Sequence, residues 1–237
     1  EPGSVFKPVT VAIGLEEGII SMDSTYNCGG SKQVVPGVPP VSCHRHSGHG
    51  QQDLTHAVMN SCNVALMDIG EAIGAETMWR YWEDFGLRET TGIDLGGEVN
   101  SIMFDEDTFK GPYGEMSVEI GSFGQTFKVT PIQMITAFAS LINGGHLMQP
   151  YLVQSIADSD GNTLYYHDPV EVRQVISEST SDKVRGILEQ VVGDSAGSGH
   201  NASQSGYRIG GKTGTSEKRD ELDNDDVMCS FMGFAPA

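Results

Sequence analysis

The chain has 237 residues, of which 38% are hydrophobic and 19% are charged, and it contains 30 glycines. This composition is typical of a folded domain with many turns, and it excludes a mainly disordered or collagen-like chain. The 32 acidic residues outnumber the 14 basic ones, and the resulting formal charge of −18 repels phosphate, which argues against a nucleic-acid partner.

The first part of the chain is predicted to consist of helices separated by a long irregular segment. The hydrophobic spacing of the N-terminal residues indicates a helix that ends at Gly18. Residues 19–52 are typical of loops and short strands. Asp53 or Thr55 is a suitable N-cap for a helix whose apolar residues continue to Ile69.

Aromatic residues mark the following helix, and a proline marks the start of the next one. Trp79, Trp82 and Phe85 recur at helical spacing, and we expect them in the core rather than on a binding surface. The Thr-Pro pair at 130–131 predicts an N-cap and a first turn, and the Gly-Gly pair at 144–145 predicts the end of that helix.

The C-terminal part of the chain combines predicted strands with a predicted helix. Turn residues at 159–161 join two of the strands, and the acidic segment 217–226 is interpreted as a solvated turn between two others. Helices in the middle and strands at the end favour an α+β or layered α/β fold over regular βαβ alternation. The strands are expected at 151–158, 162–168, 205–216 and 226–237, and the helix at 184–192.

Three short motifs carry the chemistry that the sequence suggests. Ser4 and Lys7 stand three residues apart at the start of a predicted helix, so their side chains share one face and lie within reach for proton transfer. Ser-Cys-Asn follows at 61–63 and Lys-Thr-Gly-Thr at 212–215. Each motif is weak alone, but the ordered set, with Asp in place of Cys, is that of penicillin-binding proteins and class A β-lactamases.

The chain resembles the transpeptidase domain of the class B penicillin-binding proteins, acyl-serine enzymes that cross-link bacterial peptidoglycan. The resemblance covers residues 1–237 and implies an α+β fold of layered α/β/α type, in which helices flank an antiparallel sheet. It also implies that the first strands, the last strand and the last helix of the family's domain lie outside this sequence. The segments that carry the likeness are EPGSVFK, DLTHAVMNSCN, FGLRETTGIDLGGE, GQTFKVTPIQMITAFASLINGG, GGKTGTS and SFMGFAPA.

The resemblance assigns the nucleophile and its base. Ser4 is expected to attack the carbonyl of the penultimate D-Ala of a stem peptide, and β-lactams are expected to acylate the same hydroxyl. Lys7 can accept the proton of Ser4 only when it is neutral. Burial and the nearby charge of Lys212 are therefore expected to lower the pKa of Lys7.

The other two motifs are expected to relay protons and to bind the substrate. Ser61 is the expected proton relay, and Asn63 is expected to hydrogen-bond the base and the substrate amide. Thr213, Gly214 and Thr215 are expected to bind the substrate, with the two threonines on its carboxylate. The backbone N–H groups of the nucleophile and of Thr215 are expected to form the oxyanion hole.

Partners and location also follow from the resemblance. The expected partners are D-Ala-D-Ala stem peptides, β-lactam antibiotics, and a glycosyltransferase with other cell-wall synthesis proteins, without a cofactor. No apolar run reaches the roughly 18 residues of a membrane-spanning helix, so the implied position outside the bacterial cytoplasmic membrane depends on an anchor outside this sequence. The alternatives are a β-lactamase, which adds a base and a positioned water for deacylation, and a β-lactam-sensing or scaffold domain without turnover.

The cysteines and histidines of the irregular segment leave several interpretations open. Cys28 and Cys43 flank a stretch rich in turn residues, which could bring their sulfurs together as a disulfide or leave two buried thiols. Zinc is a further alternative, but the close spacing differs from the usual ligand patterns, so the sequence predicts no metal site. Cys62 is interpreted as a small buried filler. The ligands in the zinc alternative are Cys28, Cys43, His44, His46 and His49.

Overall fold

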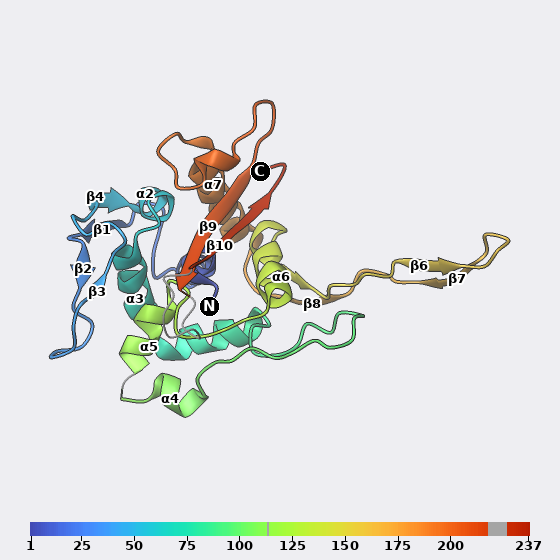
Figure 1. Ribbon diagram of the computed structural model, residues 1–237, viewed down its shortest axis with the longest axis horizontal. Coiled ribbons are helices and arrows are strands. Elements are labelled where there is room, and N and C mark those ends of the chain that lie inside the picture. Colours follow the sequence, from blue (N-terminus) through green and yellow to red (C-terminus); the bar gives the residue numbers. More distant parts are fainter. Residues whose placement is uncertain (113, 218–226) are drawn as a thin grey trace.

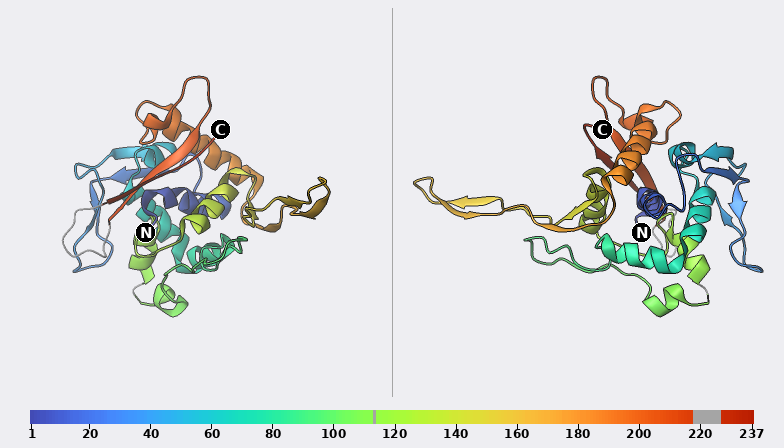
Figure 2. Two further views of the ribbon diagram at one scale, coloured as in Figure 1. Left: turned by 45° about the vertical axis from the view of Figure 1, so that its right-hand side comes forward. Right: turned by 180° about the vertical axis from the view of Figure 1, so that it is seen from behind.

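A helix that is buried on almost every side forms the centre of the fold. The computed structural model of the protein describes residues 1–112, 114–217 and 227–237. In it, α1 (Lys7–Glu16) follows a short 3₁₀ turn, η1 (Gly3–Phe6), and every residue of α1 before Glu16 is buried. A helix that is covered all round belongs in the interior, and Figure 2 shows α1 in dark blue among the other elements.

Further helices surround α1. The larger ones, which all contact it, are α3 (Asn63–Asp84), α6 (Pro131–Ile142) and α7 (Glu178–Gly193). The aromatic residues predicted for the core are indeed buried: Trp79, Trp82 and Phe85 are each at most 2% exposed. The shorter helical segments are α2 (Leu54–Met59), α4 (Glu106–Lys110), α5 (Gly114–Gly121) and η2 (His200–Ala202).

The strand pairs of the described residues are antiparallel. In the longest pair, β9 (Gly210–Glu217) runs against β10 (Val227–Phe234). Both α7 and η1 pack against β9, so this hairpin lies over the helical core (Figure 1). The remaining pairs are β1 (Thr25–Cys28) with β4 (Gly50–Asp53), β2 (Ser31–Lys32) with β3 (Val41–Ser42), β5 (His146–Met148) with β8 (Glu171–Gln174), and β6 (Ser155–Ala157) with β7 (Thr163–Tyr166).

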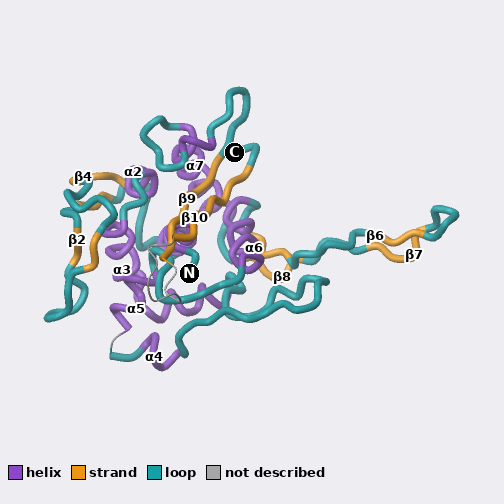
Figure 3. The backbone as a smooth tube through the Cα atoms, viewed as in Figure 1, coloured by secondary structure: helices purple, strands orange, loops and turns teal. Residues whose placement is uncertain are grey.

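Helices and antiparallel strand pairs together make an α+β fold, which confirms the predicted class. Figure 3 shows the helices gathered in the body of the molecule, while the hairpin of β6 and β7 projects away from it. The turn of that hairpin is the predicted one, since the N–H of Gly161 donates to the carbonyl of Asp158 at 3.1 Å. In the described parts of the chain, no helix combines the length and the apolar character needed to cross a membrane.

The prediction of one continuous helix over 53–69 is wrong. Asp53 is the N-cap as expected, because its side chain accepts a hydrogen bond from the N–H of His56 at 2.8 Å. The helix is interrupted between α2 and α3, where Ser61 has a φ of 51°, outside the right-handed helical region. The helix expected around Trp79 is the second half of α3, which follows a kink at Gly74.

Other boundaries differ less from the prediction. The helix predicted to start at the Thr-Pro pair is α6. It begins with a capping box, in which the side chains of Thr130 and Gln133 each accept a hydrogen bond from the other's backbone N–H. The first helix begins as the 3₁₀ turn η1, and the strand expected from 205 begins at Gly210. Of the acidic turn expected at 217–226, the part from 218 onward lies outside the described residues.

Candidate active site

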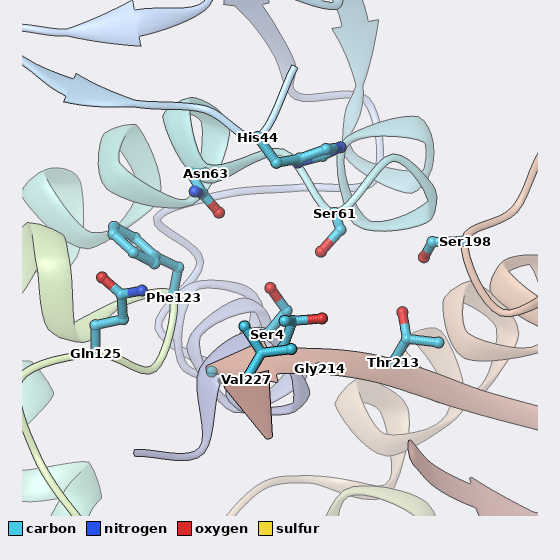
Figure 4. A pocket seen from close by; sticks show the side chains of 12 residues that line it. Ser4, His44, Ser61, Asn63, Phe123, Gln125, Ser198, Thr213, Gly214 and Val227 are labelled. Atoms are coloured by element: carbon cyan, nitrogen blue, oxygen red, sulfur yellow. The ribbon is translucent and has the colours of Figure 1, made fainter. Parts of the chain in front are cut away.

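The predicted nucleophile lies at a cleft where the N-terminal turn meets β9. Ser4 belongs to η1 and lines a cleft of about 480 Å³, across from Ser61 (Figure 4). Within the described residues, its hydroxyl has no hydrogen-bond partner. The preceding Gly3 has a φ of +60°, and a Cβ at that position would lie 2.7 Å from the carbonyl oxygen of Thr215. Glycine therefore allows β9 to pack directly against the turn that carries Ser4.

Lys7 is completely buried at the start of α1. Its Nζ donates to the backbone oxygen of Ser61 at 2.5 Å, to Oδ1 of Asn63 at 2.7 Å and to Oγ of Ser61 at 3.1 Å. Burial lowers the pKa of Lys7 to about 7, although Cys43 and Cys62 act in the opposite direction. Near neutral pH, a large fraction of the Lys7 amine is therefore neutral and able to accept a proton.

Lys212 is a second completely buried lysine, contributed by β9. Its Nζ lies 3.0 Å from Oγ of Ser61 and donates to the backbone oxygen of Thr213 at 3.0 Å. Burial lowers the pKa of Lys212 well below its usual value, and the charge of Lys7 lowers it further. Because the two amines share one serine hydroxyl, their like charges disfavour the state in which both are protonated.

The hydroxyl of Ser61 joins the two lysines. It lies 3.1 Å from Nζ of Lys7 and 3.0 Å from Nζ of Lys212. The φ of 51° at Ser61 is uncommon for a residue with a side chain. The N–H of Cys62 donates to the carbonyl of Ala57 at 2.9 Å and helps to hold this turn. The interruption between α2 and α3 thus presents the serine hydroxyl to both amines.

The third motif forms the wall of the cleft on β9. Thr213, Gly214 and Thr215 all line it. A Cβ at Gly214 would lie 2.9 Å from Cγ1 of Val5 and 2.7 Å from Oγ of Ser230, so a larger residue would push β9 away from η1. The structure thus brings the three motifs together at one cleft, and the individual roles of their residues stay predictions.

Several described residues of the cleft were missed by the sequence analysis. The segment after α5 reaches the cleft because the N–H of Gly3 donates to the carbonyl of Gly124 at 2.8 Å. The signal available for it was the Gly-Gln-Thr run at 124–126 within the family likeness. His44 was considered only as a metal ligand. The lining residues that the sequence analysis did not assign to the cleft are His44, Phe123, Gln125, Ser198 and Val227. None of the described lining residues is acidic.

The structure confirms one of the alternatives for Cys28 and Cys43 and corrects the interpretation of Cys62. Cys28 and Cys43 do come together, as free buried thiols rather than as a disulfide. The buried thiol of Cys62 joins them, so it is not merely a filler, and His49 completes the group. The four ligand atoms all lie within 4.8 Å of one another. The histidines at 44 and 46 do not belong to this group.

Comparison with known proteins places these observations in a family. The family model described as penicillin binding protein transpeptidase domain matches residues 1–237. Stage V sporulation protein D of Bacillus subtilis is 40% identical over 243 residues, covering 100% of this chain and 36% of that protein. The chain is also similar to the D,D-transpeptidase domain of a peptidoglycan glycosyltransferase from Eggerthella lenta, with a TM-score of 0.86 and 26% identity over 99% of this chain and 57% of that one.

A further solved structure is similar and contains an antibiotic. It is penicillin-binding protein 3 of Mycobacterium tuberculosis complexed with ampicillin, with a TM-score of 0.86 and 27% identity over 99% of this chain and 52% of that chain. The chain therefore spans a little over a third of the length of the sporulation protein and about half of each solved chain. Since the family match runs from the first residue to the last, the chain belongs to the penicillin-binding protein transpeptidase domain family.

Proposed function

We propose that the chain is the catalytic domain of a peptidoglycan D,D-transpeptidase that works through an acyl-Ser4 intermediate and is inhibited by β-lactams. The observation that carries the proposal is the hydrogen-bonded chain from Lys7 through Ser61 to Lys212 at the cleft that contains Ser4. A serine with a nearby neutral amine, a relay hydroxyl and a cation is a constellation for acyl transfer.

In the acylation step, Ser4 Oγ forms a bond to the carbonyl carbon of the penultimate D-Ala. The proton of Ser4 passes to the neutral amine of Lys7. Collapse of the tetrahedral intermediate breaks the peptide bond, and the terminal D-Ala leaves after its nitrogen receives a proton through Ser61. The backbone N–H groups of Ser4 and Thr215 hold the oxyanion, a contribution of about 2.7–4 kcal/mol for a donor of this kind.

Recognition of the substrate falls to the other cleft residues. Thr213, Gly214 and Thr215 accommodate the terminal carboxylate beside the amine of Lys212, and Asn63 hydrogen-bonds the substrate amide. A β-lactam offers a similar carbonyl and carboxylate, and so it enters by the same contacts. Ampicillin and aztreonam are both present in structures of the similar Mycobacterium tuberculosis protein, which supports this part of the proposal.

In the second step, an amine of a neighbouring stem peptide takes the acyl group from Ser4. The β-lactamase alternative requires a base that activates water instead, such as the glutamate of class A enzymes. No Asp or Glu occurs among the described residues that line the cleft. This observation favours transfer to an amine over hydrolysis.

Location and partners follow from the proposed reaction. Peptidoglycan is assembled outside the bacterial cytoplasmic membrane, so we infer that the domain lies there, held by a membrane anchor. A glycosyltransferase and other cell-wall synthesis proteins supply the glycan strands that carry the stem peptides.

The proposal is tested by incubation of the purified protein with a penicillin while its intact mass is followed over time. We expect a long-lived adduct on the parent protein, and none on Ser4→Ala. Ser203→Ala, which changes an exposed serine, is the matched control and is expected to form the adduct. Circular dichroism shows whether each variant is folded.

Other outcomes separate the alternatives. An adduct that hydrolyses rapidly with turnover identifies a β-lactamase. An adduct without release of D-Ala from a stem pentapeptide in the presence of an acceptor amine indicates a sensor or scaffold. The absence of an adduct on the folded parent protein would refute the assignment of Ser4 as nucleophile.

A further inference from the structure

Three cysteines and a histidine from different segments converge beside the loop that carries Ser61 and Asn63, here called the catalytic loop. Cys28 is the last residue of β1, Cys43 directly follows β3, His49 directly precedes β4, and Cys62 is the N-cap of α3. Their ligand atoms all lie within 4.8 Å of one another, and the three cysteines are at most 2% exposed. Thiolates and imidazole are the preferred ligands of zinc in proteins.

Two glycines build the turns that bring these ligands together. A Cβ at Gly30 would lie 2.0 Å from the carbonyl oxygen of His46, and one at Gly48 would lie 2.2 Å from that of Cys28. Both glycines have positive φ angles, +100° and +76°, so a side chain would be strained at either position as well as crowded. The N–H of Cys43 also donates to the carbonyl of Gly30 at 2.8 Å. The backbone is therefore arranged for close approach of the two ligand-bearing turns.

The separation between Cys43 and His49 suits two ligands of one metal ion, and no disulfide links the cysteines. Sulfur and nitrogen ligands about 2.3 Å and 2.0 Å from a tetrahedral zinc ion lie about 3.5 Å apart. Cys43 Sγ and His49 Nδ1 are separated by 3.7 Å. A disulfide would place two sulfurs about 2.05 Å apart, whereas all the cysteines of the cluster are free.

Cys62 lies at the N-terminus of α3, directly after Ser61. Its Sγ caps α3 and accepts a hydrogen bond from the N–H of Ala65 at 3.5 Å. This sulfur belongs to the residue between Ser61 and Asn63, so any ion that it binds is attached to the catalytic loop.

We propose that Cys28, Cys43, Cys62 and His49 form a tetrahedral zinc site that fixes the loop carrying Ser61 and Asn63. The ion ties β1, β3 and β4 to the N-terminus of α3. Four protein ligands close the coordination sphere, as in structural zinc sites, so the ion does not itself take part in acyl transfer. The effect on catalysis, unlike the metal site itself, rests on the proposed function.

Metal content of the purified protein tests the site without reference to activity. The protein is prepared under reducing conditions without chelator, and we expect about one zinc ion per chain, as for a closed structural site. Cys28→Ser and His49→Gln are expected to lose the zinc. The matched controls Cys229→Ser and His46→Gln change an exposed cysteine and an exposed histidine outside the cluster, and they are expected to retain it.

X-ray absorption of the unaltered protein keeps the test valid if the variants do not fold. We expect three sulfur ligands and one nitrogen ligand around zinc, at about 2.3 Å and 2.0–2.1 Å. Removal of the ion with a chelator, followed by addition of zinc alone, is expected to lower and then restore the melting temperature. Removal of the zinc is also expected to slow penicillin acylation of Ser4 by about 10²-fold, which is the effect of a small displacement of a catalytic group.

Three results would overturn the proposal. The first is a reduced, folded protein that contains no zinc and gains none when zinc is added. Mass spectrometry of the alkylated protein could instead reveal a disulfide within the cluster in the protein as isolated. Loss of zinc from His44→Gln, with retention by His49→Gln, would refute the ligand set, because Nδ1 of His44 also lies 3.8 Å from Cys43 Sγ. An adduct on Ser4 in protein without zinc would leave the proposed function intact.

Discussion

Acylation of Ser4 by a penicillin is expected to accelerate as the pH rises through about 7. Only the neutral amine of Lys7 can accept the proton of Ser4, and burial lowers the pKa of Lys7 to about 7. The neutral fraction then increases about tenfold between about pH 6 and pH 8. With the ordinary pKa of 10.5, by contrast, only about 0.3% of the amine would be neutral at about pH 8.

The charged groups around Lys7 act in both directions. Burial is the largest influence and favours the neutral amine, whereas Cys43 and Cys62 raise the pKa of Lys7. Lys212 shares the hydroxyl of Ser61 with Lys7, and there the charge of Lys7 lowers the pKa of Lys212. The exposed His44 lines the same cleft. The expected midpoint near 7 follows because burial outweighs the attraction of the sulfurs.

The assay is the second-order rate constant of acylation, measured by intact mass after rapid quenching between about pH 6 and pH 9. Lys7→Met is expected to reduce the rate by about 10²–10⁴-fold, the usual contribution of a positioned base, and to remove the step near pH 7. Lys183→Met, which changes an exposed lysine of α7, is expected to leave the acylation rate and its step near pH 7 unchanged. A flat profile, or a rise centred near pH 10 with a protein that stays folded, would refute the reasoning.

The remaining predictions concern the relay, the cleft wall and one helix cap. Ser61→Ala removes the hydroxyl that joins the two lysines, and its acylation rate constant is expected to fall by about 10²–10⁴-fold without a change of fold by circular dichroism. Gly214→Ala, whose Cβ would meet Val5, is expected to slow acylation by about 10²-fold, whereas Gly186→Ala in open space on α7 is expected to leave the rate unchanged. Thr130→Ala breaks the capping box of α6 and is expected to cost about 1 kcal/mol, seen as a melting temperature about 2–4 °C lower.

The motifs could be predicted from the sequence because their residue types are tied to chemistry and their order is informative. The expectation that Lys7, Ser61 and Lys212 meet is matched by hydrogen bonds of 3.1 Å and 3.0 Å. Nothing local in the sequence specifies that contact, since it joins residues far apart along the chain. It became predictable only through the resemblance to a family.

The interruption between α2 and α3 could not be predicted from local rules. The apolar spacing over 53–69 continues through Ser61 as if one helix ran across it. In the structure, the backbone oxygen of Ser61 accepts a hydrogen bond from the buried amine of Lys7, and the turn adopts a positive φ. A tertiary contact thus overrides local helix propensity, and it does so at a residue of the second motif.

The cysteine cluster shows a similar limit. The sequence grouped Cys28 and Cys43 because they flank a hairpin, which is a local feature. Cys62 lies in a different predicted element, and its approach depends on how the hairpins pack against α3. Separation along the chain therefore concealed a group of side chains whose ligand atoms lie within 4.8 Å.

The large acidic excess of the chain does not dominate the electrostatics of the cleft. Acidic side chains engage lysines elsewhere, as where Asp68 and Glu71 bind Lys32 at 2.8 Å and 2.6 Å, and exposed charges beyond about 8 Å are screened at physiological ionic strength. A carboxylate in contact with Lys7 would raise its pKa and keep it protonated. None occurs among the described lining residues, so no carboxylate there offsets the burial that lowers the pKa of Lys7.

This arrangement favours reactivity over stability. The pKa of Lys7 is about 7 in the folded protein and 10.5 for an ordinary lysine, so between these values the unfolded chain binds the extra proton. Stability therefore rises with pH across that window, and below about pH 7 the buried amine is at its most destabilising. A methionine in its place would avoid this penalty, but it would leave Ser4 without its proposed base. The fold thus retains a buried amine whose cost is explained only by its chemistry.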